Sequence, residues 1–163
     1  MGAIISSLLG IAACQDHGEN NRSSTISDPT FIDRKTLDAV VDAFVPKDQD
    51  AGAVEAGASE KLLELFEKSE DMRNHGTALL ARVEVVAQHK YRKPFYQLSL
   101  AKREEIIHKT LYSPRKDDQS ASLAINILSG HVIRAFYLSP VGQSILGYTP
   151  PYPNGYPDYH TPL

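Results

Sequence analysis

The sequence predicts an all-α protein, a compact bundle of five or six helices around a buried central helix, with an irregular Pro/Tyr-rich C-terminal tail. Apolar residues recur at helical spacing throughout residues 30–146, and no alternating run of strand length occurs. One segment, 118–138, is apolar nearly all round, which is typical of a helix surrounded by other helices. A chain of 163 residues fits one domain with a sizeable core.

The first two helices follow from apolar stripes on either side of a polar turn. One stripe has the spacing i, i+3, i+4, i+7 and i+8 and predicts a helix that Pro46 ends. Its members are Leu37, Val40, Val41, Phe44 and Val45. Residues 46–52 are polar, and a second helix is expected from about Ala53 to about Met72. Its expected buried residues are Leu62, Leu65 and Phe66.

The third and fourth helices are bounded by glycine and proline. Residues 74–76, Asn-His-Gly, are expected to break the chain before the third helix. The apolar residues of that helix are Leu79, Leu80, Val83, Val86 and Ala87. Pro94 closes this region, and Ser99 is suited to cap a fourth helix that ends at Ser113-Pro114. The apolar residues of the fourth helix are Ile106, Ile107 and Leu111.

The fifth helix, between Asp118 and Leu138, is apolar around nearly its whole circumference and should be the central, buried element. Its exceptions lie four residues apart on one face, with a histidine beside them. This set is either a narrow stripe that faces solvent or a polar seam where another chain docks. The candidate partner-binding residues of this helix are Asn126, Gly130, His131 and Arg134.

The C-terminal residues 147–163 hold half of the ten prolines and half of the eight tyrosines of the chain. Proline fixes φ and lacks a backbone donor, so neither a helix nor a central strand is expected here. A stiff segment with large amphipathic side chains loses little entropy when it lies on a surface, either of its own domain or of a partner. The candidate contact residues of this tail are Tyr148, Tyr152, Tyr156 and Tyr159.

The N-terminal residues 1–14 resemble a signal peptide with a bacterial lipobox at its end. Residues 3–13 are apolar or small and uncharged, too few to span a bilayer but suited to a secretory signal. The sequence Ile-Ala-Ala precedes the single cysteine, Cys14, which would carry the lipid on the periplasmic side of a bacterial membrane. The polar residues 15–29 would form a flexible tether. A plain cleaved signal, N-terminal myristoylation and an ordinary buried segment are the alternatives.

The chain carries no residue pattern that indicates catalysis or cofactor binding of its own. Its six histidines include no HExxH motif and no two spaced four apart. A glycine-rich phosphate loop, a GxSxG elbow and a CxxCH haem motif do not occur. A net charge of -3 without a basic, aromatic cluster argues against nucleic acid as a partner. We therefore expect a non-catalytic subunit that binds no metal and no cofactor.

Two segments carry a resemblance to a known family. Residues 37–57 (LDAVVDAFVPKDQDAGAVEAG) form a helix that ends in Val-Pro, an acidic turn and an Ala/Gly-rich stretch. Residues 146–159 (LGYTPPYPNGYPDY) are the more specific part, and residues 95–107 also fit. Together these segments resemble the gluconate 2-dehydrogenase subunit 3 family, the small subunits of membrane-associated flavin-dependent sugar and sugar-acid dehydrogenases.

The resemblance implies a helical subunit bound to a large flavoprotein of the glucose-methanol-choline (GMC) oxidoreductase type. That partner would carry FAD and the catalytic residues, and would pass electrons to a cytochrome c subunit or a quinone. The small subunit is credited with stability, maturation and export, so no catalytic residue carries over to this chain. Members of the family commonly have a twin-arginine signal. No Arg-Arg precedes the apolar run here, and anchoring of the partner through Cys14 is the more natural role.

Two functional classes therefore compete. The first is an accessory subunit of a dehydrogenase that oxidises a sugar, a glycoside or a sugar acid. The second is a free-standing, lipid-anchored helical module that binds another protein of the cell envelope. A gene for a large flavoprotein beside this one would favour the first.

Overall fold

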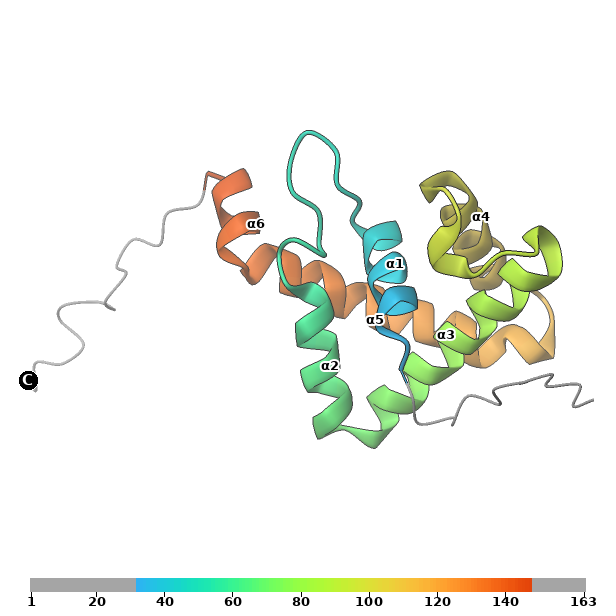
Figure 1. Ribbon diagram of the computed structural model, residues 1–163. Coiled ribbons are helices and arrows are strands. Elements are labelled where there is room, and N and C mark those ends of the chain that lie inside the picture. The colour runs from blue at the N-terminus through green and yellow to red at the C-terminus, as the bar shows by residue number, and fades with distance from the viewer. Residues whose placement is uncertain (1–31, 148–163) are drawn as a thin grey trace, which may run out of the picture.

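The computed structural model describes residues 32–147, and within that range the chain is all-α, as the sequence predicts (Figure 1). Residues 1–31 and 148–163 lie outside the described part. The helices are α1 (Arg34–Phe44), α2 (Ala58–Lys68), α3 (Glu70–Tyr91), α4 (Leu100–Leu111), α5 (Gln119–Leu138) and α6 (Pro140–Ile145). Short 3-10 turns precede α4 and α5, at Phe95–Gln97 (η1) and Lys116–Asp118 (η2).

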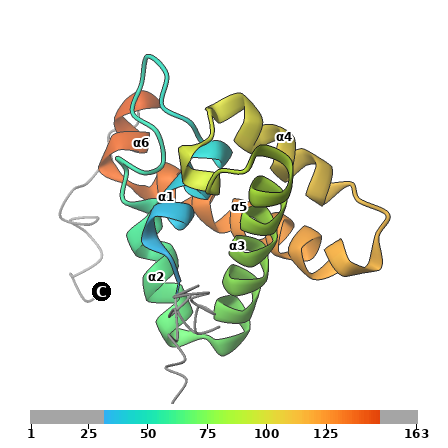
Figure 2. The same ribbon diagram turned by 45° about the vertical axis from the view of Figure 1, so that its right-hand side comes forward.

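The long helix α5 is the central element, which confirms the prediction from its composition. It contacts each of the other five helices, and α3 most extensively. Its buried residues are Ala121, Ala124, Ile125, Leu128, Val132 and Phe136. In two views α6 lies at one end of the domain and the turn between α4 and α5 at the other, so α5 spans the domain (Figures 1 and 2).

The prediction that α5 is buried nearly all round is wrong. Leu123 and Ile133 are 52% and 44% exposed, although a helix apolar on every side was expected to be covered. The buried residues occupy one side of α5, and α1 and α3 cross in front of it in Figure 1. Within residues 32–147, no element covers the opposite side. An apolar helix in a small bundle is therefore central without being enclosed.

The first helix forms where its apolar stripe predicts. Asp33 caps its N-terminus by accepting hydrogen bonds from the backbone N–H groups of Lys35 and Thr36, at 3.4 and 3.1 Å. The helix ends at Phe44, just before Pro46, which cannot donate to a further turn.

The second helix is shorter than predicted at both ends. It begins at Ala58 instead of Ala53, because Gly57 adopts a left-handed conformation (φ +79°) that closes a separate turn before it. It ends at Lys68 instead of Met72, where Ser69 is extended (φ -138°). The Ser69 hydroxyl then accepts a hydrogen bond from the Met72 N–H at 3.4 Å and caps α3.

The predicted break at residues 74–76 does not exist, since α3 runs without interruption from Glu70 to Tyr91. Gly76 is buried inside this helix, and a Cβ atom there would lie 2.7 Å from Cζ of Phe66 on α2. The glycine therefore allows the Phe66 ring to pack directly against the α3 backbone. It is a packing residue, and the real break between the two helices is at Ser69.

The fourth helix begins at Leu100 and ends at Leu111, as predicted from Ser99 and Ser113-Pro114. Ser99 occupies the N-cap position, but its hydroxyl makes no capping hydrogen bond. The turn before it is held from α3, because Glu84 accepts a hydrogen bond from the Phe95 N–H at 2.8 Å. The Phe95 side chain is fully buried and joins this turn to the core.

Candidate functional site

The exposed side of α5 is the main candidate for a functional surface. Seven residues spaced three or four apart lie on this side, which we call the α5 outer face. They are Leu123, Asn126, Ile127, Gly130, Ile133, Arg134 and Tyr137. Tyr137 is 46% exposed, so large apolar side chains stand in solvent along the whole length of the face. Six of the nine exposed large hydrophobic residues within 32–147 belong to α5, α6 and the residue after α6, which concentrates the apolar surface there.

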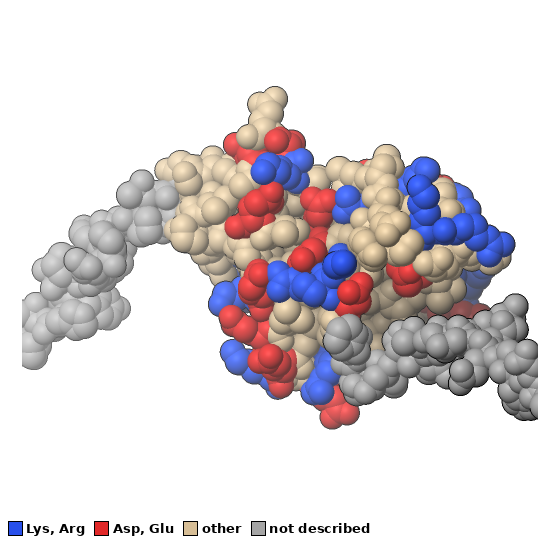
Figure 3. All heavy atoms as spheres, in the orientation of Figure 1, with Lys and Arg blue, Asp and Glu red and all other residues tan. Residues whose placement is uncertain are grey.

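The apolar surface continues onto α6, whose position against α5 is fixed by short-range contacts. The Ser139 hydroxyl donates to the Phe136 carbonyl oxygen at 2.6 Å and accepts from the Gly142 N–H at 3.0 Å. A Cβ atom on Gly142 would lie 2.2 Å from the Phe136 oxygen, so only glycine permits this packing. The exposed residues added at this end are Leu138, Ile145 and Leu146. Figure 3 shows that the α6 end of the molecule, at the left, is largely free of charged side chains.

Three of the four candidate residues predicted on this helix share the outer face. Asn126 is exposed, and its amide donates to the Ser122 carbonyl oxygen at 3.2 Å. Gly130 is exposed in the middle of the helix, and Arg134 is exposed one turn further on. Apolar side chains flank all three, so they form neither a narrow solvent stripe nor a purely polar seam. They are polar positions within a mixed, mainly apolar surface.

The fourth predicted residue, His131, is half-buried and lies to one side of that face. With Arg134 it lines a cavity of about 420 Å³ between α2 and the C-terminal end of α5. Apolar side chains from α2 and α5 form much of its wall, and Lys61, which also lines it, is paired with Glu64 at 2.9 Å. The remaining candidates, Cys14, Tyr148, Tyr152, Tyr156 and Tyr159, lie outside the described residues.

Sequence reasoning missed the apolar half of this surface. Leu123 and Ile133 belong to a helix that was expected to be buried, and Tyr137 was not singled out at all. Their spacing from Gly130, by seven or three residues, could have placed them on the side that carries Asn126 and Arg134. The position of these residues on the polar side of the helix could therefore have predicted their exposure, although their side chains are apolar.

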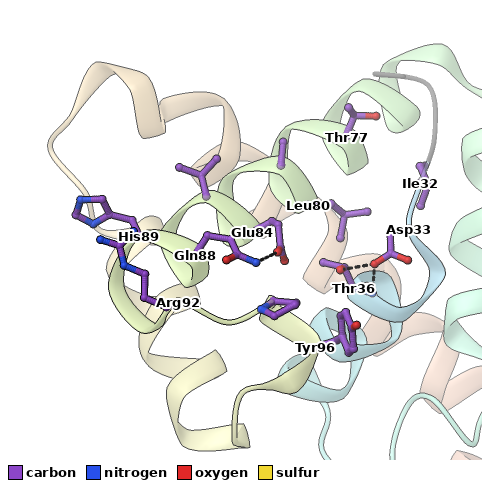
Figure 4. A pocket seen from close by; sticks show the side chains of 13 residues that line it. Ile32, Asp33, Thr36, Thr77, Leu80, Glu84, Gln88, His89, Arg92 and Tyr96 are labelled. Atoms are coloured by element: carbon purple, nitrogen blue, oxygen red, sulfur yellow. Dashed lines mark hydrogen bonds between the residues drawn. The ribbon is translucent and has the colours of Figure 1, made fainter. Parts of the chain in front are cut away.

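A second concave surface runs along α3, with a volume of about 1220 Å³ (Figure 4). Leu80 and Ala81 of α3 are among its apolar residues, and Pro94 and Tyr96 line it from the η1 side. Its acidic groups serve the fold: Asp33 caps α1, and Glu84 accepts hydrogen bonds from Gln88 and from the Phe95 N–H. This groove is therefore built from structural contacts, with its carboxylates already engaged.

Several charged residues elsewhere on the described surface form ion pairs, such as Lys47 with Glu55 and Lys90 with Glu105. Acidic and basic side chains are interspersed over the face in Figure 3. Hydrogen bonds from Lys109, Lys90 and Tyr91 lower the pKa of Glu105 to about 2. Within residues 32–147, no group of three or more His, Cys, Asp or Glu side chains is arranged to hold a metal ion.

The segment Lys116–Leu138 is long and apolar enough to cross a membrane, by length and composition only. An 18-residue stretch of this segment has a mean hydropathy of 1.3, and 33% of that stretch is buried inside the domain. The core helix of a soluble protein meets the same criterion.

Comparison with known proteins places this domain in a family. The chain matches the model of the family described as gluconate 2-dehydrogenase subunit 3 over residues 32–155, which include the whole described domain and part of the tail. No curated protein and no solved structure matches it. The family description is that of one subunit in a multi-subunit dehydrogenase complex. This chain belongs to the gluconate 2-dehydrogenase subunit 3 family.

Proposed function

We propose that this chain is the non-catalytic small subunit of a flavin-dependent dehydrogenase that oxidises a sugar, a glycoside or a sugar acid. It stabilises, matures and anchors a large GMC-type flavoprotein, which carries FAD and the catalytic residues. The observation that supports this most is the exposed apolar surface of α5 and α6. Apolar surface gathered on one side of a domain is a feature of protein–protein and membrane interaction sites, and the description of the family as a subunit favours a protein partner.

The dimensions of this surface fit the centre of an interface. From Leu123 to Tyr137 the α5 outer face is about 21 Å long, at 1.5 Å per residue. With a helix about 10 Å wide, it offers on the order of 200 Å², against roughly 800 Å² per partner in a stable complex. The proposal therefore assigns the remaining contact to α6 and to the tyrosines of residues 148–159. The family match, which extends to residue 155, agrees with a role for part of the tail.

Co-purification tests whether this chain is the non-catalytic partner of a flavoprotein. We expect the full chain, recovered from native membranes, to bring with it a large flavoprotein that mass spectrometry identifies. Expressed alone, it should show neither flavin absorbance nor dehydrogenase activity with an artificial acceptor, and both should be present in the complex. Flavin or turnover in the isolated chain would refute the proposal. Recovery of a different envelope protein would support the free-standing binding module instead.

The proposal also assigns membrane anchoring to Cys14, with residues 15–29 as the spacer between lipid and domain. A lipoprotein cysteine that bears several acyl chains holds a protein at a bilayer more strongly than one myristate does. Replacing Cys14 with serine should therefore release the chain, with its flavoprotein, into the soluble periplasmic fraction. A variant that stays in the membrane fraction with Met1 intact by mass spectrometry would show that Cys14 is not the anchor.

A further inference from the structure

The glycine at position 130 has no explanation inside the described domain. It lies in the interior of α5, where glycine is less favourable than alanine because it loses more backbone freedom on folding. A Cβ atom there would meet nothing within 4 Å, and the glycine does not have a positive φ. Gly76 and Gly142 differ, since a Cβ atom would collide with Phe66 or with the Phe136 carbonyl. Neither space nor backbone conformation requires glycine at Gly130.

Gly130 lacks a side chain between four larger apolar residues of the α5 outer face, and we call this position the Gly130 notch. Leu123 and Ile127 precede it on the same face by seven and three residues, and Ile133 and Tyr137 follow it by three and seven. A missing side chain at the centre of such a face lets a second backbone approach closely. Helices that pack side by side are usually 8–10 Å apart, depending on the side chains at the contact, and glycine permits the shorter distances.

The polar residues beside the Gly130 notch indicate the chemistry of the partner. Arg134, one turn after Gly130, is exposed and makes no hydrogen bond or ion pair with any other residue of 32–147. Asn126, one turn before it, uses its amide N–H within the helix, which leaves its side-chain oxygen free to accept. A partner that pairs with Arg134 should supply a carboxylate, because guanidinium and carboxylate groups form the stronger, charge-assisted hydrogen bonds.

We propose that an amphipathic helix of the large flavoprotein subunit crosses α5 at Gly130. Its apolar residues pack against Leu123, Ile127, Ile133 and Tyr137, and one of its acidic residues pairs with Arg134. This inference rests on the proposed function and adds the kind of element that docks. A helix suits the face because α5 offers side chains only, with no unpaired strand edge to which an extended chain could add.

A second copy of this chain is a poorer fit on grounds of charge. An antiparallel crossing of two such helices at Gly130 would place each Arg134 opposite the Asn126 of the other copy. Both guanidinium charges would then lack a carboxylate within the interface. A heterologous partner with an acidic residue neutralises Arg134 instead, so the flavoprotein is the occupant that the charges favour.

Gly130→Ala in the full chain tests the crossing, because it should affect the free chain and the complex in opposite directions. In the isolated chain, the higher helix propensity of alanine should raise the unfolding midpoint by about 4 °C. In the complex, the added methyl group should weaken binding to the co-expressed flavoprotein by about tenfold, as overpacking does at a close contact. Gly130→Leu should weaken binding further while the isolated chain still folds.

Two controls separate this inference from the proposed function. Glu104→Ala, at an exposed position of α4 away from the α5 outer face, should leave the affinity for the flavoprotein unchanged. Arg134→Glu should reduce this affinity more than Arg134→Lys does.

If the native chain binds no flavoprotein, the proposed function fails. If the native chain binds and both Gly130 variants bind equally well, the crossing is wrong while the function stands. An isolated chain that dimerises, and that Gly130→Leu converts to a monomer, would also overturn it in favour of a second copy.

Discussion

Replacing Asp118 with alanine is expected to lower the free energy of unfolding by about 3 kcal/mol, because it leaves a partly buried cation without its partner. Asp118 is 3% exposed at the start of α5. One of its carboxylate oxygens lies 2.5 Å from Nε of Arg82 on α3, and the other accepts a hydrogen bond from the Ser113 hydroxyl. The Arg82 side chain is 24% exposed, so it reaches water only in part once the carboxylate is removed.

The expected loss is large because this carboxylate joins three parts of the chain. From the N-cap position of α5 it contacts α3 and the turn after α4, and a negative charge at this position also interacts favourably with the helix dipole. The Arg82 contact is an ion pair without the alignment of a hydrogen bond, so its contribution is mainly Coulombic. Urea unfolding followed by circular dichroism measures the change.

Asp117→Ala is the matched control. Asp117 occupies the same turn but is exposed, and its replacement should change the free energy of unfolding by no more than about 0.5 kcal/mol. Equal effects of the two substitutions would show that the general negative charge near α5, and not the buried ion pair, stabilises this end of the domain.

Helical periodicity predicted the fold because each helix buries one stripe against a common core. The stripe from Leu37 to Val45 corresponds to α1, and Ser113-Pro114 marks the end of α4. Both are local signals, since a stripe or a proline acts on the few residues beside it. The all-α class and the position of α5 at the centre followed from such signals alone.

The wrong boundaries have a different origin, because the sequence does not say which chain segment a glycine faces. A glycine such as Gly76 predicts a helix break from sequence. It nevertheless lies inside α3, where Phe66 of α2 occupies the space beside it. Gly57 was placed inside a helix, although its positive φ ends a turn and precedes α2. In both positions the deciding contact or conformation is set by tertiary structure.

Only the polar residues of the candidate surface could be predicted from the sequence, for a related reason. Asn126, Gly130 and Arg134 stood out as polar interruptions of an apolar helix, and they do share one exposed face. Leu123 and Ile133 did not, because an apolar side chain on a central helix is expected to be buried. Whether such a residue is covered depends on how many helices surround α5, which composition does not report.

Replacing Ile133 with glutamate is expected to weaken binding to the flavoprotein by about a hundredfold, or about 2.7 kcal/mol, while the isolated chain stays folded. Ile133 is 44% exposed in the free domain, so glutamate there remains hydrated, and unfolding should change by no more than about 0.5 kcal/mol. In the complex the same side chain would be buried next to Gly130, at the centre of the interface. A carboxylate there would lose its hydration without gaining a partner. Isothermal titration with the purified flavoprotein measures the affinity.

Val85→Glu is the matched control, since it places the same charge on another exposed apolar residue. Val85 is 58% exposed in the groove along α3, which lies on a different surface from the α5 outer face. If α5 carries the docking surface, Val85→Glu should bind the flavoprotein like the native chain. If Val85→Glu abolishes binding and Ile133→Glu binds the flavoprotein with native affinity, the docking site is the groove along α3. The pair of variants therefore assigns the interface to one of two surfaces, because each substitution alters only one of them and neither changes the core that holds both in place.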